Sequence, residues 1–329
     1  MIIVTGGAGF IGSNLVAALE AKHKGAQDIV VVDRLGTDEK WRNIAKRDLA
    51  AIVPPERFFD FLMAHASEID VIFHMGAISS TTETDADLIV RENVTLPLEL
   101  WRWCTDHDVR LIYASSAATY GDGTNGFDDD FSPAAQAKLQ PLNAYGWSKH
   151  LFDRRAVALA GRGEHPPQWA GLKFFNVYGP NEYHKGSMQS VVAHNTPKIV
   201  AGEPARLFKS YRPDYEHGGQ LRDFVFVDDC VNVMLWLEDT PDVSGIYNIG
   251  SGKARSFADL ARAIFTALKL EPKIDWIEMP ESLREKYQYF TEASMDRLRS
   301  AGWPGQSTPL EEGVRRYVQE HLTVEDPYR

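Results

Sequence analysis

The sequence predicts an α/β fold in which a doubly wound parallel sheet is joined by a smaller α/β lobe. The first observation is the run Ile-Ile-Val-Thr at 2–5, which suits a buried strand and continues through a glycine-rich turn into a helix carrying Phe10, Ile11, Leu15 and Leu19. The second observation is a series of further strand-like runs, separated by helical segments, at 29–32, 71–74, 111–114 and 247–250. Strands that alternate with helices in this way are typical of a parallel sheet.

Composition limits the classes of protein that fit this sequence. The chain has 329 residues with 44% hydrophobic content, enough for a large core and for two domains or one domain with a lobe. Its formal net charge of −11 argues against nucleic acid or an anionic membrane as a partner. Cys104 and Cys230 lie far apart and lack the spacing of metal ligands, so we expect neither a disulfide framework nor a metal site. With no leader-like segment and no long apolar run, we expect a cytoplasmic protein.

The glycine-rich turn after the first strand has the spacing of a dinucleotide-binding loop. Gly7, Gly9 and Gly12 satisfy the pattern G-x-G-x-x-G, and Gly6 with Gly9 and Gly12 satisfies its wider-spaced variant. One glycine permits the tight turn, one lets the backbone approach a pyrophosphate, and one lets helix and strand pack closely. Its position between a strand and a helix favours cofactor binding over an ordinary turn and predicts a Rossmann-type sheet.

An acidic residue is expected about 20 positions further on, at the end of the second strand, to bind the adenosine ribose. Asp33 follows the run at 29–32 and fits this role. Arg34 and Lys40 could pair with a ribose 2′-phosphate, whereas Asp33 would repel it. The choice between NADP and NAD, and between ligands and a solvated loop for the two cations, stays open on the residues alone.

We expect a helix after Pro54-Pro55 that turns Phe58, Phe59, Leu62 and Met63 inward. The segment that follows the next strand-like run, at 71–74, is expected to lie along the cofactor. Small residues follow the strand at 71–74, in Met75, Gly76 and Ala77, where backbone can approach adenine and ribose. The polar run 79–83 then opens a long helix to about residue 107, with Asn93 facing the cofactor, whereas His74 is expected to be a packed histidine at the strand end.

A candidate catalytic group follows the strand at 111–114. That strand delivers Ser115 and Ser116 at its carboxyl end, and a later helix after Asn143 carries Tyr145, Ser148 and Lys149. Tyr145 and Lys149 are four residues apart and share one helix face. An ammonium near a phenol stabilises the phenolate and lowers the tyrosine pKa, which makes a usable general base, while a serine hydroxyl can hold a substrate oxygen.

These motifs resemble those of the extended short-chain dehydrogenase/reductase superfamily. The resemblance rests on TGGAGFIGSN, YASSAATYG, YGWSK and FFNVYGP and extends over nearly the whole chain. Within the superfamily the sequence looks most like the epimerases that invert C6 of an ADP-linked heptose, through residues 111–121, 143–154 and 176–194. The resemblance implies bound NADP, with NAD less favoured, an ADP-heptose substrate, a role in making the inner core of lipopolysaccharide, and assembly as a homo-oligomer, often a pentamer.

The resemblance also implies a mechanism with two bases. Tyr145 would deprotonate the C6 hydroxyl of one epimer while hydride passes to the cofactor, and the hydride would return to the opposite face of a 6-keto intermediate. Lys185 would serve the other epimer, although the sequence alone favours a flexible loop lysine at this position. Ser116 would polarise the ketone, and Lys149 would bind the nicotinamide ribose and tune Tyr145.

The expected binding residues fall into two sets. Those expected to bind the cofactor are Gly6, Gly9, Phe10, Ile11, Gly12, Asp33, Arg34, Lys40, Met75, Gly76, Ala77, Ile78, Ser79, Asn93, Lys149, Val177 and Lys185. Those that the resemblance implies for the substrate are Ser116, Asn176, Ser187, His194, Phe208, Lys209, Ser210, Tyr211, Arg222 and Tyr287. Arg222 is a candidate for the diphosphate, and the loop 209–223 is longer and more charged than the family pattern leads us to expect.

We expect residues 1–175 and 223–249 to form the NADP-binding domain, and residues 176–222 and 250–329 the substrate-binding lobe. A strand ends at Asn176-Val177, residues 223–229 return the chain to the first domain as a strand and helix cap, and helices lie near 257–268 and 292–300.

Three alternative functions share part of this pattern. A nucleotide-sugar 4,6-dehydratase would carry an acidic pair where Ala117, Ala118 and Thr119 stand, which argues against elimination. A hexose 4-epimerase shares every cofactor motif and is opposed only by residues 176–222. A non-catalytic NADP-sensing protein would not need Ser116, Tyr145 and Lys149 together.

Overall fold

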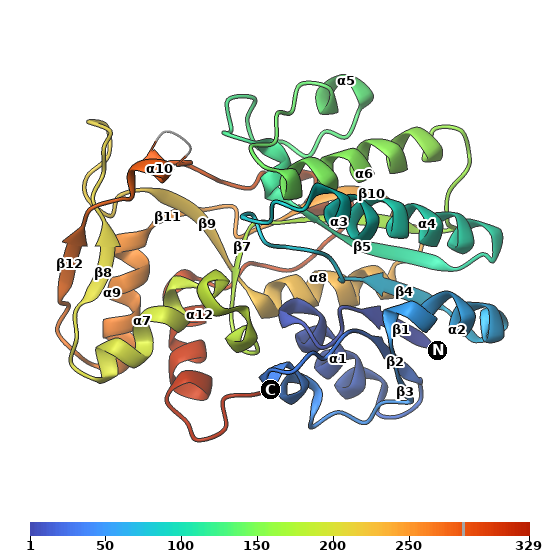
Figure 1. Cartoon of the computed structure of the whole chain (residues 1–329), viewed down its shortest axis with the longest axis horizontal. Coiled ribbons are helices and arrows are strands. Elements are labelled where there is room, and N and C mark those ends of the chain that lie inside the picture. Colours follow the sequence, from blue (N-terminus) through green and yellow to red (C-terminus); the bar gives the residue numbers. More distant parts are fainter. Residues whose placement is uncertain (285–286) are drawn as a thin grey trace.

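The computed structural model, which describes residues 1–284 and 287–329, is built on a seven-stranded parallel sheet. Figure 1 shows this sheet and its helices on one side of the molecule and the smaller lobe on the other. In the strand order β3-β2-β1-β4-β5-β6-β10, successive strands are added outward from β1 on one side and from β4 on the other, while all of them stay parallel. This order is that of a doubly wound fold, so the expected fold class is confirmed. In that order the strands are β3 (Ala51–Val53), β2 (Ile29–Val32), β1 (Ile2–Thr5), β4 (Val71–His74), β5 (Arg110–Ser116), β6 (Trp169–Phe174) and β10 (Gly245–Ile249).

Helices cover both faces of the sheet, because the central strands are mostly apolar on both sides. Ile2 and Val4 of β1 contribute to one core cluster, and Ile3 contributes to the other. The first cluster is covered by α1 (Phe10–His23), α8 (Val227–Asp239) and α11 (Asp296–Ser300), and the second by α2 (Phe58–Ala64), α4 (Leu96–Asp106) and α6 (Ala144–Ala160). Of the short helices, α5 (Pro133–Gln136) lies above α6 in Figure 1, and α3 (Ala86–Val90) lies below α6 beside α4.

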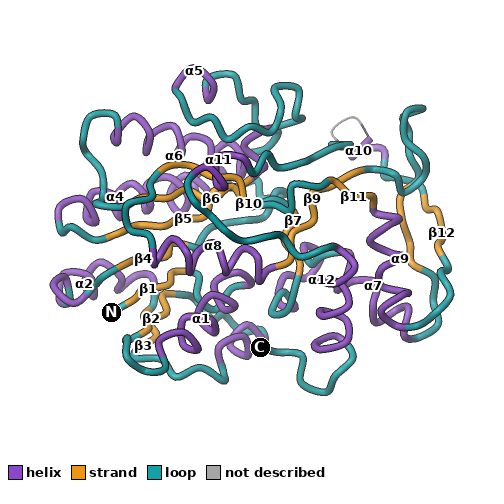
Figure 2. Tube along the Cα trace, turned by 180° about the vertical axis from the view of Figure 1, so that it is seen from behind, coloured by secondary structure: helices purple, strands orange, loops and turns teal. Residues whose placement is uncertain are grey.

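The smaller lobe has its own two sheets and its own core. β7 (Asn176–Tyr178), β9 (Leu221–Phe226) and β11 (Ala254–Ser256) form one sheet, and β8 (Ala205–Phe208) pairs with β12 (Ile274–Ile277) in the other. Its helices are α7 (Val191–Val200), α9 (Phe257–Leu268), α10 (Glu281–Arg284) and α12 (Leu310–Tyr317). The chain then returns to the larger part, and Figure 2 shows its C-terminal end beside α1. Among the described residues, no helix has the length and apolar character needed to span a membrane.

The long helix expected from residues 79–83 begins later than predicted. Glu83 accepts hydrogen bonds from the Thr84 and Asp85 N–H groups, and the side chain of Asp85 caps a helix that begins at Ala86. The stretch Arg91–Thr95 is π-helical, with the Leu96 N–H bonded to the Arg91 carbonyl, and Pro97, which has no N–H to donate, follows in the first turn of α4. Residues 77–85 are therefore a loop at the carboxyl edge of the sheet.

Several other local predictions were wrong. Met63 of α2 is exposed, while Phe58 and Leu62 of the same helix are buried. The strand expected to end at Val177 is two strands, β6 and β7, which break at Phe175 and enter different sheets. The helix expected near 292–300 begins only at Asp296.

The division of the chain into two parts stays a proposal, and two segments lie away from their expected part. β9 was expected to return to the first domain, but it pairs with β7 and β11 in the lobe, and α8 makes the return. Ala293, Met295 and Leu298 were expected in the lobe, but they lie in the core cluster of the large sheet.

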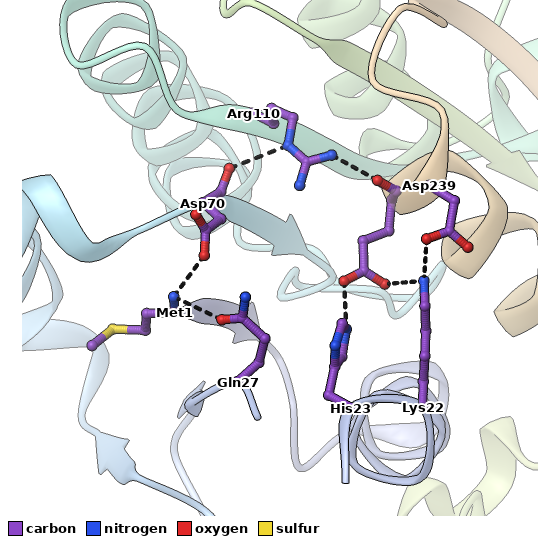
Figure 3. A network of polar contacts seen from close by, with 8 residues as sticks. Met1, Lys22, His23, Gln27, Asp70, Arg110 and Asp239 are labelled. Carbon is purple, nitrogen blue, oxygen red and sulfur yellow. Dashed lines mark hydrogen bonds and ion pairs between the residues drawn. The ribbon is translucent and has the colours of Figure 1, made fainter. Parts of the chain in front are cut away.

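The amino ends of the strands are held together by a polar network (Figure 3). The amino group of Met1 contacts Asp70 at 2.7 Å, and Arg110 bonds the carbonyls of Asp70 and Glu238 at 3.3 and 2.8 Å. Glu238 also receives Lys22 at 2.9 Å and His23 at 2.7 Å. The network thus connects α1, α8, β1, β4 and β5 at the edge opposite the glycine-rich loop.

Candidate active site

The glycine-rich loop lies where the strand order reverses, and its glycines are required by close backbone contacts. A Cβ on Gly12 would lie 2.2 Å from the Gly6 carbonyl oxygen. Gly6 has a φ of +64°, and a Cβ there would lie 2.6 Å from the backbone of Gly76, which follows β4. The loop therefore leaves the N-terminus of α1 open to an anionic group, which fits the residues to a bound dinucleotide.

A cavity of about 530 Å³ runs from this loop along the carboxyl ends of the strands, a volume typical of ligand sites. It brings together sixteen of the expected residues: Gly6, Gly9, Phe10, Ile11, Gly12, Asp33, Lys40, Met75, Gly76, Ala77, Ser79, Ser116, Tyr145, Lys149, Val177 and Lys185. The sequence prediction of where these residues meet therefore agrees with the structure, while their roles stay proposals.

The acidic end of the site is held by two contacts to one carboxylate. Asp33 accepts the Ala8 N–H at 2.9 Å with one oxygen and the Lys40 ammonium at 2.6 Å with the other. A neighbouring cavity of about 210 Å³ is lined by Arg34, Ile78 and His74 among others. Arg34 points to carboxylates, with Glu56 at 2.7 Å and Glu92 at 3.7 Å, so its guanidinium is already paired.

Asn93, which was expected to face the cofactor, contacts the loop 77–85 with its side chain instead of lining the cavity. Its side-chain amide bonds both the N–H and the carbonyl of Ile78 at 2.9 Å, and it donates to the Ser148 hydroxyl at 3.0 Å. Asn93 is buried and is not among the described residues that line either cavity. It therefore connects loop 77–85 to α6, which carries Tyr145.

Tyr145 and Lys149 enter the cavity from the first turns of α6. The helix begins there because the side chain of Asn143 accepts the Gly146 N–H at 2.8 Å. Lys149 is 4% exposed and donates to the Ala114 carbonyl at 2.8 Å. Burial lowers the pKa of Lys149 to about 8, so the side chain is still mostly charged near neutral pH.

The pKa of Tyr145, which was expected to be lowered by Lys149, is raised in the structure. Burial raises the pKa of Tyr145, and the Asp153 carboxylate adds to that rise, while a hydrogen bond with Ser116 acts in the other direction. The ammonium of Lys149 bonds a backbone carbonyl rather than the phenol. The helical spacing places the two groups together, but it does not determine how much water reaches them.

Lys185 lies in the same cavity as Tyr145. Its ammonium lies 5.1 Å from the centre of the Phe10 ring, and burial lowers its pKa, which the nearby Glu182 partly offsets. Glu182 is itself occupied, since it accepts the N–H and the hydroxyl of Ser190, both at 2.6 Å. Two proton-carrying side chains from distant parts of the sequence thus border one space.

The residues expected to bind substrate are spread from the cavity into the lobe. Ser116 lines the cavity, whereas Asn176 and Ser187 are exposed, and His194 on α7 approaches the Ser187 carbonyl at 3.4 Å. Lys209 and Tyr211 both bond Glu278, and Ser210 accepts the Arg212 N–H at 3.2 Å.

The guanidinium of Arg222 packs against aromatic rings of the lobe, and one of these rings belongs to Tyr287, which is also expected to bind substrate. The guanidinium lies 5.2 Å from the Tyr287 ring centre and 5.7 Å from that of Phe257, and the Phe208 and Tyr287 rings are 6.4 Å apart. Arg222 is only 8% exposed, and its hydrogen bonds go to the carbonyls of Leu221 and Gln288. A buried cation bonded to carbonyls can still accept an anion.

Some residues of the cavity were not predicted. Ser115, Phe174, Phe175 and His184 line it, although Ser115 adjoins Ser116 in the sequence and both phenylalanines occur in the motif FFNVYGP. His184 could have been found as the neighbour of Lys185. In the part of the chain that the structure describes, no group of three or more His, Cys, Asp or Glu side chains is arranged to hold a metal.

A doubly wound sheet with a dinucleotide loop, and with Ser116, Tyr145 and Lys149 on one cavity, defines an enzyme of the dinucleotide-dependent dehydrogenase type. The comparisons agree and are more specific. Residues 2–250 match the NAD dependent epimerase/dehydratase family, and the chain belongs to that family.

Its relatives cover the chain from end to end. It is 50% identical to an ADP-L-glycero-D-manno-heptose-6-epimerase of Nitratidesulfovibrio vulgaris strain DP4 over 331 residues, covering 100% of both chains. It is 47% identical to one of Fusobacterium nucleatum subsp. nucleatum, again over 100% of both chains. Among solved structures, the Helicobacter pylori ADP-L-glycero-D-manno-heptose-6-epimerase superposes with a TM-score of 0.79 at 26% identity, covering 98% of this chain and 96% of that one.

Proposed function

We propose that this protein inverts C6 of the heptose in ADP-D-glycero-β-D-manno-heptose and so supplies a precursor of the lipopolysaccharide inner core. The printed names of two full-length relatives, at 50% and 47% identity, support this substrate. The observation that carries the proposal is that Tyr145 and Lys185 border one cavity. Inversion needs proton transfer for two epimers whose hydroxyls point in different directions, and two separate groups can serve them.

Each side chain has a role that follows from its position. A bound nicotinamide would accept a hydride from the sugar carbon and return it. Tyr145 takes the hydroxyl proton of one epimer, Lys185 takes that of the other, and the Ser116 hydroxyl donates to the carbonyl oxygen between the two steps. Lys149, which donates to the Ala114 carbonyl in the structure, would hold the nicotinamide ribose of a bound cofactor, and its charge favours the Tyr145 phenolate. The raised pKa of Tyr145 means that the proton stays on the phenol until ligands complete the site.

The lobe supplies the contacts for the nucleotide part of the substrate. Arg222 is fixed between Phe257 and Tyr287, and its buried charge suits a diphosphate. A buried guanidinium lies in a weakly screening environment, so an anion that reaches it binds more strongly than it would at the surface.

We also propose NADP as the resident cofactor. The ammonium of Lys40 is only 20% exposed and lies at the ribose end of the cavity, where it offsets the charge of Asp33. A 2′-phosphate could take Lys40 from Asp33, whereas Arg34 would first have to leave Glu56. Mass spectrometry of the cofactor released on denaturation distinguishes the two. Recovery of NAD alone would contradict this part of the proposal.

The central test uses the purified protein without added cofactor and follows the C6 proton of ADP-D-glycero-β-D-manno-heptose by NMR. We expect a mixture with the L-glycero epimer, formed by a cofactor that is recycled within the enzyme. An unchanged spectrum from protein shown to contain cofactor would overturn the proposal, and C4 inversion of a UDP-hexose would then favour the alternative 4-epimerase. The homo-oligomer implied by the resemblance, a pentamer included, is tested by light scattering during size-exclusion chromatography.

A further inference from the structure

A buried ion pair lies directly behind the candidate catalytic residues and was not expected from the sequence. Lys173 of β6 and Asp153 of α6 are 3.1 Å apart, with side chains 4% and 1% exposed. Asp153 also accepts the hydroxyls of Ser115 at 2.6 Å and Tyr113 at 3.1 Å. Every oxygen of this carboxylate is therefore occupied by groups from β5 and β6.

The ion pair is connected in two ways to residues that line the cavity. In the first, Lys173 donates to Thr119 at 2.6 Å, and the Thr119 hydroxyl donates to the Ser116 carbonyl at 2.8 Å, which fixes the turn that presents Ser116. In the second, Asp153 lies one helical turn beyond Lys149 on α6, on the same face. Two buried lysines thus lie near a single carboxylate, and Lys173 is the one bonded to it.

This arrangement leaves the charge of Lys149 unneutralised. A carboxylate and an ammonium in contact act on more distant groups as a dipole, which is much weaker than a lone charge. Asp153 acts to raise the pKa of both Lys149 and Tyr145, so a lone Asp153 charge would oppose formation of the phenolate. With Asp153 paired to Lys173, Lys149 donates to the Ala114 carbonyl, contacts no carboxylate among residues 1–284 and 287–329, and keeps its charge available.

We propose that Lys173 is a positioning residue that occupies Asp153, so that the charge of Lys149 acts on Tyr145 and the cofactor instead of being neutralised within the protein. The proposal rests on the proposed function for the role of Tyr145. Among the residues that the structure describes, the other titratable groups facing the pair are Tyr113 of β5, Tyr120, whose ring centre lies 4.8 Å from the Lys173 ammonium, and His150 of α6, while the exposed Arg154 acts on His150. Burial and the nearby Lys173 lower the pKa of His150 to about 4, so it is neutral in the working range.

The test compares Lys173→Met, Asp153→Asn and the double variant Asp153→Asn/Lys173→Met. Lys173→Met frees the carboxylate, which should raise the Lys149 pKa and shift the acid limb of the turnover profile to higher pH, each by about one unit. Asp153→Asn should shift both to lower pH. The double variant should return both to within about 0.3 units of the wild type, because no lone charge remains.

The Lys149 pKa is read by NMR titration of 13Cε-labelled lysine in the protein as purified, with the resonance assigned from Lys149→Arg. This measurement needs no sugar, so a wild type that fails to convert ADP-heptose would overturn the proposed function and still leave the inference testable. Lys173→Arg keeps the charge and should restore the wild-type titration. The matched control is Lys22→Met, which removes a lysine–carboxylate contact at the far edge of the sheet and should shift neither pKa nor profile.

Opposite shifts in the two single variants, cancelled in the double variant, would support the inference, since a purely structural role predicts loss of activity without a change of sign. Equal titration of Lys149 in all variants, or shifts of the same sign in both single variants, would overturn it. A lone buried carboxylate strongly destabilises a fold. If Lys173→Met does not fold, the other two variants still decide the question. Asp153→Asn should lower the Lys149 pKa, and the double variant should return it to the wild-type value.

Discussion

The amino edge and the carboxyl edge of the large sheet differ in whether their cations are paired with carboxylates. At the amino edge, Met1, Lys22 and His23 each contact a carboxylate within 3 Å (Figure 3). At the carboxyl edge and in the adjoining lobe, Lys149, Lys185 and Arg222 are buried or half-buried, and among residues 1–284 and 287–329 none lies within 4 Å of a carboxylate. One edge is neutralised within the protein, and the other carries positive charge that the protein itself does not neutralise.

The difference shows which charges are structural and which are functional. A buried cation without a counter-charge costs stability, so it persists where a ligand supplies the missing partner. Two lysines at the carboxyl edge are nevertheless paired with carboxylates, Lys40 with Asp33 and Lys173 with Asp153, and Lys173 is the more deeply buried of the two. Lys173 is paired with a carboxylate like the structural cations at the amino edge, but it lies beside the candidate catalytic residues at the carboxyl edge.

Tyr145→Phe is expected to have the largest effect at the carboxyl edge. The substitution removes one hydroxyl from a buried side chain, so the fold and the bound cofactor should be kept while turnover falls about 10³-fold, as for loss of a general base. Turnover is measured by NMR of the C6 proton, and cofactor content by absorbance. A rate within tenfold of the wild type would remove Tyr145 from the mechanism.

Lys185→Met is expected to have the next largest effect, about a 10²-fold loss of turnover in both directions. The sharper readout is the near-ultraviolet absorbance of the cofactor. The variant should still reduce its cofactor when mixed with the epimer that Tyr145 serves, and should fail to do so with the other. The matched control is Lys198→Met on α7, where the lysine is exposed. Equal reduction by both epimers would contradict the two-base assignment.

His74 extends the comparison to an uncharged group at the carboxyl edge. Its Nδ1 lies 2.7 Å from the Thr5 hydroxyl, and burial together with Lys149 lowers its pKa to about 3. Unfolded chain takes up a proton near pH 6.5 while the folded state does not, so stability should fall as the pH falls from 6.5 toward 3, by up to about 1.4 kcal/mol per unit.

Urea unfolding of the wild type and His74→Gln at several pH values checks this prediction. The variant should show a flatter dependence on pH, and His65→Gln, at a half-exposed histidine of the surface, should not. Equal slopes for the wild type and His74→Gln would show that His74 does not govern acid sensitivity.

The sequence was informative wherever a property depends on neighbours along the chain. The glycine loop, the strands at 2–5, 29–32 and 71–74, and the shared helix face of Tyr145 and Lys149 follow from spacing, and the structure has them. Where the property depends on tertiary contacts, prediction failed. The Tyr145 pKa depends on burial, the role of Asn93 on its contact with Ile78, and the start of α3 on competition between side-chain caps.

The ion pair of Lys173 likewise depends on tertiary contacts. Asp153 and Lys173 are 20 positions apart and come together only because α6 packs across β5 and β6. No local pattern marks either residue, and a lysine inside the run WAGLKF of β6 is visible only as an anomaly in an otherwise apolar strand. A charged residue within a central strand is therefore the signal that could have prompted a search for its partner.

Lys22→Met should have the smallest effect on stability and turnover, and it tests whether the charges at the amino edge are structural alone. Lys22 contacts Glu238 at 2.9 Å and Asp239 at 2.6 Å, but its side chain is 26% exposed, and His23 continues to contact Glu238 after the substitution. The free energy of unfolding should fall by less than about 1 kcal/mol, and the loss should shrink further in high salt, because solvent screens a partly exposed pair. Turnover should stay within twofold of the wild type, since the network touches only the amino ends of the strands. A larger loss of turnover than of stability would mean that the amino edge affects the site through the sheet, and the separation of structural from functional charge would then fail.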